Sequence, residues 1–509
     1  MAASVQSAVT SMEPSQQSVR IFGAVPPPAS EPRRLLITSL LVCANTVQFI
    51  SNFVTFAGGL ALTKELGKEN GSGHTNWMAA SYPLTQGAFV LITGRLGAIY
   101  GHQRVVLLGC LIFAVFSLAN AFCTSYDAFI AARALSGVGG GFFLPNAVSS
   151  ITIMVPPGRS RNLFMGFFAA SPPIGGVLGA VLAGAFIEGV GWNALSTAGI
   201  MGLLMYLGVA DIPVDKNGRI DYVGAILGLA SLLLLNIVCN QAPAVGWSTP
   251  YVIACLVVTA ILFTGFIVWE KKFDEPIMPL HIFKAPTFSA LISVTLLSYM
   301  GAGIDLWYAV AWLQQLRSVS VLQTGIHFIP FGCSALAAVF LAAWLISRVR
   351  AEFILAIGIC MVVATSLLLA TMPIQQTYWA QVFPAFLFAG FCPDLIFVAA
   401  QVIASGSVNR QQQGIASSLV GTLNLYGTSL GLGIGATIES EVIKIRDEAS
   451  GFRAALYFAA GIAVVALAVD VTFVRVPKDR REGWESPVEE ELQPVATVTA
   501  VEVIQSHQE

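Results

Sequence analysis

Residues 222–269 read YVGAILGLASLLLLNIVCNQAPAVGWSTPYVIACLVVTAILFTGFIVW, and they include no Asp, Glu, Lys or Arg. A helix needs roughly 20 residues to cross the hydrocarbon layer of a bilayer, so this stretch is long enough for two crossings. Residues 353–393 repeat the pattern, and shorter stretches free of the same four residue types occur at 35–63, 105–126, 162–187, 318–347 and 411–438. The pattern predicts an all-α, polytopic membrane protein that works in the lipid bilayer, and transport across that bilayer is the leading functional hypothesis.

The composition supports this prediction. Charged residues make up 11% of the 509-residue chain, against about 25% in soluble proteins, and mean hydropathy is +0.75. A net charge of −2 gives no indication of a nucleic-acid partner. The eight cysteines all lie in or beside apolar stretches without a CxxC pair, so we interpret them as packing residues and expect no metal site.

Fourteen spans are predicted, at about 35–62, 77–97, 105–123, 128–153, 162–187, 192–210, 222–240, 251–269, 286–312, 321–346, 353–371, 377–404, 413–438 and 454–474. With the N-terminus in the cytoplasm, the inner segments carry 19 Lys and Arg residues and the outer segments carry 6. This excess of positive charge on one side predicts that both termini are cytoplasmic. Asn70 then lies in the first outer loop, within the only N-x-[ST] sequon, and is either a glycosylation site or part of an unmodified loop.

Residues 94–104, GRLGAIYGHQR, join the second and third spans on the inner side. Glycines spaced by three and four residues allow a tight turn and close helix contact. The stretch resembles the signature loop of the major facilitator superfamily, although Ala98 replaces the acidic residue of the family pattern and Ile99 replaces a basic one. The residues that match, and that we expect to act in conformational change, are Gly94, Arg95, Gly97, Gly101 and Arg104.

Residues 133–141, RALSGVGGG, lie in the fourth span, and Arg133 and Gly137 match the superfamily motif RxxxGxG. A guanidinium group cannot lose its charge, so within a membrane it needs a partner or a wet cavity. Two interpretations stay open. Arg133 either binds backbone carbonyls of a neighbouring helix or faces the transport path and tunes proton transfer.

Residues 169–179, AASPPIGGVLG, lie in the fifth span and resemble the antiporter signature GxxxGPxxGG of drug:proton exporters, with Ser171 in place of one glycine. Any tightly packed bundle can also use such a small-residue seam. The residues of this motif that we expect to govern helix bending and packing are Pro172, Pro173, Gly175, Gly176 and Gly179.

Five further stretches are similar to the fungal fourteen-span drug:proton antiporter branch of that superfamily: WMAASYPLT at 77–85, IDYVGA at 220–225, EPIMPL at 275–280, DLIF at 394–397 and QGIASSL at 413–419. The resemblance implies two six-helix bundles with two extra transmembrane helices between them, and substrate binding near mid-membrane with alternating access. The implied segments are a disordered cytoplasmic tail at 1–33, the N-terminal bundle at 34–210, the additional helices at 211–270, the C-terminal bundle at 271–476 and an acidic disordered cytoplasmic tail at 477–509.

Titratable side chains within spans are the candidates for proton coupling, since a carboxyl group away from water accepts a proton more readily. These candidates are Arg133, Asp305, Asp394 and His327. Three alternatives stay open: Asp305 forms a helix-packing hydrogen bond, Asp394 caps a helix break after Pro393, and His327 has no relay role. We expect Asp470, near the inner end of the last span, to be solvated.

Polar and aromatic side chains at lipid depth tend to face the interior of the bundle. The candidates for lining a substrate pathway are Asn45, Gln48, Asn52, Gln86, Trp307, Tyr308 and Asn424. Hydrogen bonding between helices, without substrate contact, is the alternative role for the amides. The aromatic rings beside Asp305 suit a cationic or amphipathic substrate.

These features favour a proton-coupled exporter of a drug-like compound or secondary metabolite. No GxxxxGK[ST] nucleotide-binding loop occurs, and we expect no cofactor. The alternatives are a uniporter or importer of a small polar solute or ion, and a non-transporting membrane sensor. No nucleophile–base pair or other catalytic constellation indicates an enzyme. The plasma membrane is the expected location, with the vacuole or another internal membrane as the alternative, and we expect a monomer.

Overall fold

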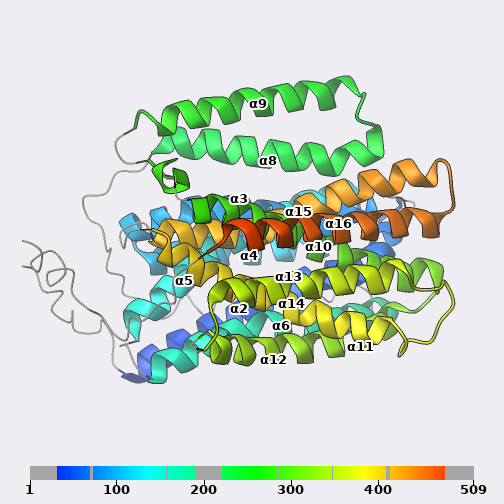
Figure 1. Ribbon diagram of the computed structural model, residues 1–509, viewed down its shortest axis with the longest axis horizontal. Helices are drawn as coiled ribbons and strands as arrows, with labels where there is room; N and C mark the ends of the chain where they lie inside the picture. Colours follow the sequence, from blue (N-terminus) through cyan, green and yellow to red (C-terminus); the bar gives the residue numbers. More distant parts are fainter. Residues whose placement is uncertain are drawn as a thin grey trace, which may run out of the picture.

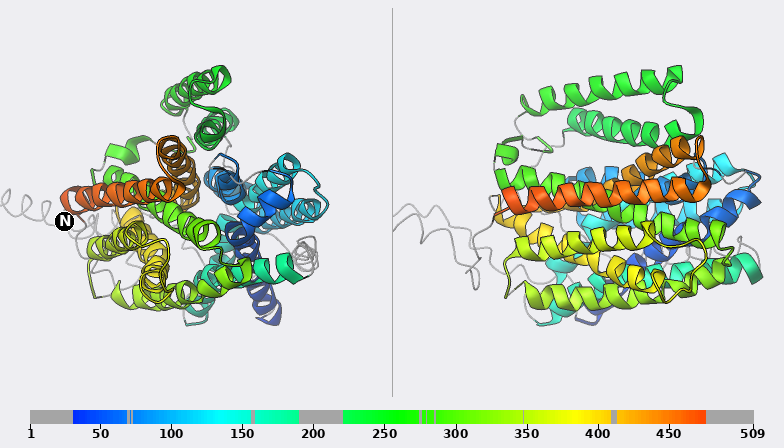
Figure 2. Two further views of the ribbon diagram at one scale, coloured as in Figure 1. Left: turned by 90° about the vertical axis from the view of Figure 1, so that its right-hand side faces the viewer. Right: turned by 45° about the vertical axis from the view of Figure 1, so that its right-hand side comes forward.

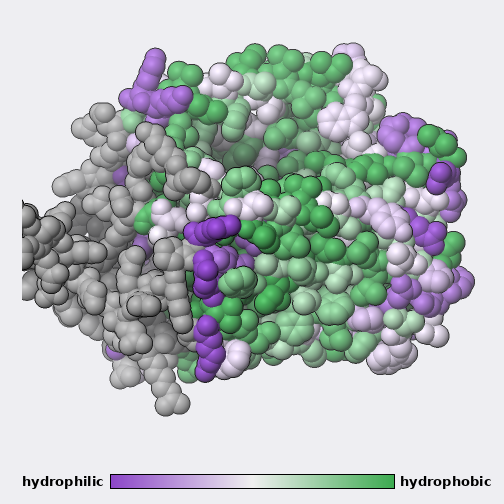
Figure 3. Space-filling view, in the orientation of Figure 1, coloured by the Kyte–Doolittle hydropathy of each residue, from purple (hydrophilic) through white to green (hydrophobic). Residues whose placement is uncertain are grey.

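The computed structural model describes residues 31–475 apart from 69–70, 72, 156–158, 190–220, 274–275, 279, 285, 347 and 409–412. Every regular element in these residues is helical, and the helices run side by side along one axis (Figure 1). Eleven helices among them are long and apolar enough to cross a membrane, judged by length and composition. In Figure 3 apolar side chains dominate the middle of the visible face, and hydrophilic ones gather towards its ends. The prediction of an all-α membrane protein is therefore confirmed.

The N-terminal part of the chain forms one group of helices. They are α2 (Glu31–Glu65), α3 (Thr75–Tyr100), α4 (His102–Ala121), α5 (Tyr126–Met154) and α6 (Arg159–Gly189). In this group α2 packs along α6, and α5 packs along both α3 and α4. The sixth predicted span, the sequon at Asn70 and most of both tails lie outside the described residues.

The C-terminal part forms a second group, in which α10 packs on α15 and α16, and α13 packs on α14 and α16. Its members are a short 3-10 helix η2 (Leu280–Lys284), α10 (Pro286–Ala311) with a π-helical end η3 (Trp312–Leu316), α11 (Val321–His327), α12 (Ile329–Leu345), α13 (Ala351–Ala370), α14 (Val382–Gly406), α15 (Gln413–Ile443) and α16 (Glu448–Phe473). Seen along the bundle, the blue-to-cyan helices and the yellow-to-red helices occupy different sides (Figure 2). The count of fourteen spans stays a prediction, because α3 and α15 are not among the eleven apolar helices and 192–210 is not described.

Two helices, α8 (Tyr222–Val245) and α9 (Pro250–Glu270), form a hairpin that stands at one side of the bundle (Figures 1 and 2). α8 packs against α15 and α3, whereas α9 contacts mainly α8. Only four residues of α9 are buried, namely Val252, Thr259, Phe266 and Glu270. The remaining apolar surface of α9 is suited to lipid.

A cluster of polar side chains fixes α8 on the bundle. Asn240 Nδ2 donates to the Ser429 carbonyl of α15 (3.1 Å), and Asn240 Oδ1 accepts from Asn76 Nδ2 of α3 (3.2 Å). Ser429 Oγ lies 2.8 Å from Asn236 Oδ1. Asn236, Asn240 and Ser429 are fully buried, so this network joins the hairpin to one helix of each group.

Replacing Asn240 with leucine tests this network. Asn240→Leu removes the contacts to both α3 and α15, and we expect a loss of about 1–2 kcal/mol of stability, the range of hydrogen bonds between membrane helices. Cys239, which is buried against Gly433 of α15, should then react faster with maleimide, as measured by peptide mass spectrometry. Ile237→Leu, on the exposed face of α8, is the control. Unchanged Cys239 labelling in Asn240→Leu would contradict the anchoring role.

Candidate functional site

Arg133 lies on α5 with 3% of its surface exposed, and it binds α2. Its guanidinium donates to Ser51 Oγ (2.7 Å), the Ser51 carbonyl (2.9 Å) and Thr55 Oγ1 (2.8 Å). The group also lies over the ring of Tyr82, 4.9 Å from its centre. The Ser51 carbonyl, which can accept a backbone hydrogen bond within α2, also accepts from the guanidinium through its second lone pair. One of the three acceptors is a backbone carbonyl and two are hydroxyls, and a role of Arg133 in proton transfer stays a prediction.

The predicted pathway amides of the N-terminal group surround this position. Asn45, Gln48 and Asn52 are buried on one face of α2, and Gln86 is buried on α3. Tyr82 OH donates to Gln48 Oε1 (3.3 Å), which connects the amide cluster to the ring under Arg133. Asn45, which donates to Ser171 of α6, and Gln48 bond between helices, whereas Asn52 Oδ1 has no hydrogen-bond partner.

The motif of the fifth span packs α6 onto α2. A Cβ on Gly175 would lie 2.5 Å from the Thr46 carbonyl, and one on Gly179 would lie 2.4 Å from the Ile50 carbonyl, so only glycine permits this approach. Ser171, the departure from the family pattern, has a defined partner, because Asn45 Nδ2 donates to its Oγ (2.6 Å). Pro172 and Pro173 lie inside the helix, and Gly176 faces the ring of Phe53.

The segment at 94–104, expected to be a loop, is helical on both sides of Gly101, because α3 ends at Tyr100 and α4 begins at His102, and Asn146 of α5 organises it. Asn146 Oδ1 lies 2.8 Å from His102 Nδ1, and Asn146 Nδ2 donates to the Thr93 carbonyl (3.0 Å). A Cβ on Gly97 would lie within 1.7 Å of Asn146 Oδ1, and Gly101 has a φ of 100°. The family pattern has an acidic residue where this chain has Ala98. In this chain the side-chain amide of Asn146 connects the segment to α5. Sequence reasoning missed Asn146, which carries no charge and matches no motif.

Asp305 lies on α10 with 2% of its surface exposed. Ser366 Oγ of α13 donates to its Oδ2 (2.8 Å), while its Oδ1 has no hydrogen-bond partner. Asp305 takes part in no ion pair among those found in the described residues. This unpaired carboxyl group is the most clearly defined proton-binding candidate in the C-terminal group.

Two expectations about other titratable residues are corrected, and the role of His327 stays a prediction. α14 continues through Pro393, so Asp394 lies inside a helix and caps no break. Because Pro393 has no N–H to donate to the Ala389 carbonyl, that carbonyl accepts from Cys392 Sγ instead (3.1 Å). Asp470 is buried, not solvated. His327 ends α11, and its ring stacks on Tyr378 of the α13–α14 loop, with ring centres 4.1 Å apart.

The sequence also failed to indicate Glu439, a buried residue of α15 that accepts a hydrogen bond from Tyr308 OH (2.7 Å). Tyr308 is thereby held by a carboxylate, and it is not free to bind substrate in this conformation. Gly431, Gly435 and Glu439 are spaced by four residues and therefore lie on one face of α15. The two glycines face α10, so Glu439 lies on the same side. Asn424, on the same helix, is only partly buried.

The two groups of helices meet through an apolar cluster near the outer end predicted from topology. Phe53 and Phe56 of α2 pack in this cluster with Trp307, Phe328 and Phe331 of the C-terminal group. Trp307 contacts Phe56 edge to face, with ring centres 6.2 Å apart. The predicted pathway residue Trp307 is therefore a contact between the two groups.

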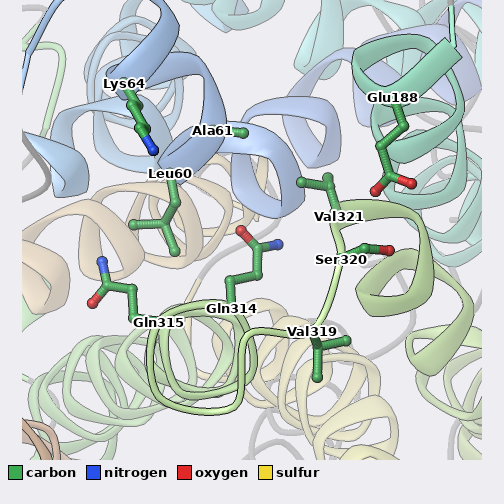
Figure 4. Close-up of a pocket in the computed structure, with 9 residues that line it drawn as sticks. All are labelled: Leu60, Ala61, Lys64, Glu188, Gln314, Gln315, Val319, Ser320 and Val321. Carbon is green, nitrogen blue, oxygen red and sulfur yellow. The ribbon is translucent and has the colours of Figure 1, made fainter.

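Besides the hydrogen bond from Ser429 Oγ of α15 to the Ala80 carbonyl of α3 (3.0 Å), two hydrogen bonds cross between the groups beside this cluster. Gln314 Nε2 donates to the Ala57 carbonyl (2.7 Å), and the Leu322 amide donates to Glu188 Oε1 (2.8 Å). A pocket of about 370 Å³ lies between these bonds, with Lys64 of α2 and Glu188 of α6 on opposite sides (Figure 4).

Comparisons with known proteins agree with this architecture. A model of the Major Facilitator Superfamily matches residues 40–294 and 291–507. A low affinity ammonium transporter of Saccharomyces cerevisiae is 31% identical, over 79% of this chain and 81% of the relative. A major facilitator superfamily multidrug transporter of Aspergillus fumigatus is 32% identical, over 82% of this chain and 75% of the relative. The crystal structure of a bacterial homologue of the human lysosomal transporter Spinster, inward-facing and unoccupied, aligns with a TM-score of 0.59 at 17% identity, over 90% of this chain and all of that one.

Arg133→Lys tests the contact between α5 and α2. A single ammonium group retains the charge but cannot match the planar fork that reaches Ser51 and Thr55, and we expect unfolding free energy to fall by about 1.5–3 kcal/mol. Thr55→Val removes one acceptor only and should cost about 1 kcal/mol. Denaturant titration in detergent measures both values. Wild-type stability in Arg133→Lys would show that the fork geometry contributes nothing.

Proposed function

This chain belongs to the major facilitator superfamily, and we propose that it is a proton-coupled exporter of a drug-like compound or secondary metabolite that works by alternating access. The observation that carries the proposal is the buried carboxyl group of Asp305, which has one oxygen bonded to Ser366 and the other without a partner. The similarity to a multidrug transporter supports the substrate class.

Asp305 suits a proton carrier for an electrostatic reason. Burying an ionised carboxylate without a cationic partner is costly, so the group stays neutral while it is enclosed and releases its proton where water reaches it. A proton drives transport only if it binds two conformations unequally. One carboxyl oxygen of Asp305 has no partner and the other has a single neutral donor, so proton binding by Asp305 depends on the conformation around it. Arg133, Asp394 and His327 are secondary candidates for the same pathway.

The closed outer contact defines the step that alternating access must reverse. Opening it would separate the aromatic cluster and break the bonds of Gln314 to Ala57 and of Glu188 to Leu322. Substrate that enters from the cytoplasmic side would then leave between α2, α6 and α11. We infer a monomeric protein of the plasma membrane with both termini in the cytoplasm, in agreement with the distribution of Lys and Arg.

Uptake or uniport of ammonium is the second candidate function. It is favoured by the 31% identity to a low affinity ammonium transporter. The two candidate functions differ in substrate and in direction of transport, so transport assays on one set of vesicles can distinguish them. Ethidium, a lipophilic cation, is the probe for export, and methylammonium is the probe for the alternative.

Asp305→Asn tests the coupling. In inverted vesicles with an imposed proton gradient, wild-type protein should accumulate ethidium, while Asp305→Asn should fall to the level of vesicles without the protein because an amide carries no exchangeable carboxyl proton. Downhill ethidium exchange without a gradient should persist in the variant.

Ser366→Ala is the matched control, because it removes the hydrogen bond to Asp305 and leaves the carboxyl group in place. It should retain gradient-driven accumulation with an altered pH profile. Wild-type accumulation in Asp305→Asn would remove Asp305 from the coupling. Methylammonium uptake without any ethidium transport would favour the second candidate.

A reversible cross-link tests the outer gate. Ala61 of α2 and Gln314 of η3 line the same pocket from the two groups of helices, so Ala61→Cys and Gln314→Cys can be joined by a short thiol-specific cross-linker. We expect the cross-linked double variant to lose ethidium transport and to recover it on reduction. The two single variants control for the substitutions. Full transport by the cross-linked protein would show that this contact does not open.

A further inference from the structure

Two buried carboxyl groups face each other at the base of the α8–α9 hairpin, far along the chain from Asp305. Asp221 is the N-cap of α8, and Glu270 is the last residue of α9. Their exposed fractions are 2% and 3%. This end of the hairpin is cytoplasmic in the predicted topology.

Each carboxyl group uses one oxygen to hold the hairpin together. Asp221 Oδ1 accepts from the Gly224 amide (2.8 Å) and from Trp269 Nε1 of α9 (2.8 Å). Glu270 Oε2 accepts from the Met278 amide (3.1 Å), which ties α9 to the segment that leads towards α10. These contacts orient both groups and leave one oxygen of each for another role.

The two remaining oxygens flank a single point. Neither Asp221 Oδ2 nor Glu270 Oε1 has a hydrogen-bond partner. A Cβ on Gly224 would lie 2.2 Å from the first and 2.8 Å from the second, so both oxygens occupy the space that glycine leaves open. Any larger residue at position 224 would displace the pair.

No cation balances these groups among the ion pairs of the described residues. Among the described residues, the groups that face the pair are the Gly224 amide from α8, the Trp269 indole from α9 and the Ile277 and Met278 amides from the following segment, all of them neutral. The neighbouring Lys271 and Lys272 are exposed. Two ionised carboxylates in this position would repel each other in surroundings from which water is largely excluded.

We infer that Glu270 carries a proton on Oε1 and donates it to Asp221 Oδ2, so that the two carboxyl groups share one proton at the hairpin base, a proton-binding site distinct from Asp305. The shared proton supplies the missing hydrogen bond and removes one negative charge. Its release at higher pH leaves two repelling carboxylates and loosens the junction of α8, α9 and Met278. Tyr222, next to Asp221, hydrogen-bonds Tyr100 at the end of α3 (3.0 Å), so the junction adjoins the segment at 94–104.

Infrared spectroscopy and thermal unfolding of the full-length purified protein test the inference. Wild type should show the carbonyl band of a protonated, hydrogen-bonded carboxyl group that shifts in D₂O. The part of this band that comes from the pair should be lost in Glu270→Gln and in Asp221→Asn, as seen in difference spectra against wild type, because a side-chain amide replaces the proton as the donor between the groups, while the contribution of Asp305 remains.

The pH dependence of unfolding follows the same logic. A proton bound in the folded protein stabilises it at low pH, and this contribution is lost as rising pH removes the proton. The melting temperature of wild type should therefore fall with rising pH more steeply than that of either variant. Glu441→Gln, which neutralises an exposed carboxylate paired with Lys444, should keep the wild-type slope.

Each variant tests the pair independently, so failure of one to fold leaves the other informative. An unchanged carbonyl band, or a pH slope of both variants equal to that of wild type, would overturn the inference. Stabilisation of wild type by NaCl or KCl at constant ionic strength, absent from both variants, would also overturn it by identifying a metal-cation site. Because none of these measurements involves transport, they stand apart from the proposed function.

Discussion

Every backbone polar group at the depth of the hydrocarbon layer must find its partner within the protein, and this constraint shapes the whole molecule. It explains why each regular element of the described chain is a helix. It also decides which helices touch. Arg133 finds three oxygen acceptors on α2, and Asn236 with Asn240 finds partners on α3 and α15. Polar side chains thus act as fixed contacts between helices in surroundings where apolar contacts alone select few partners.

Contacts within a group of helices differ in kind from contacts between the groups. Within the N-terminal group, a charged fork and glycine seams lock α5 and α6 against α2. Between the groups, glycines such as Gly184 and Gly325 bring α6 and α11 into backbone contact, with two hydrogen bonds at their edge. A boundary made of small residues, rings and a few replaceable hydrogen bonds can separate without leaving a buried charge unpaired. This difference suits the rocking of two rigid halves that the proposed alternating access requires.

Buried carboxyl groups in this protein fall into three environments. Glu439 is engaged by Tyr308 OH, Asp305 has one neutral donor and one open oxygen, and Asp221 faces Glu270. The last two settings leave carboxyl oxygens without a hydrogen-bond partner, and so does buried Asp470 at its Oδ1. Of these, we propose proton binding at Asp305 in the C-terminal group and at the Asp221–Glu270 pair at the base of the hairpin.

The sequence by itself determined the membrane location, the helical class, the positions of most spans and the family. Hydropathy and glycine spacing are properties of each segment alone and do not depend on how the helices pack. It identified Arg133 and Asp305 for the same reason, since an ionisable residue in an apolar stretch stands out. It could not show that Asp470 is buried, that α14 passes through Pro393 unbroken, or that Glu439 binds Tyr308. Those facts depend on which face of a helix points inward and on partners more than a hundred residues away, and only packing in three dimensions decides them.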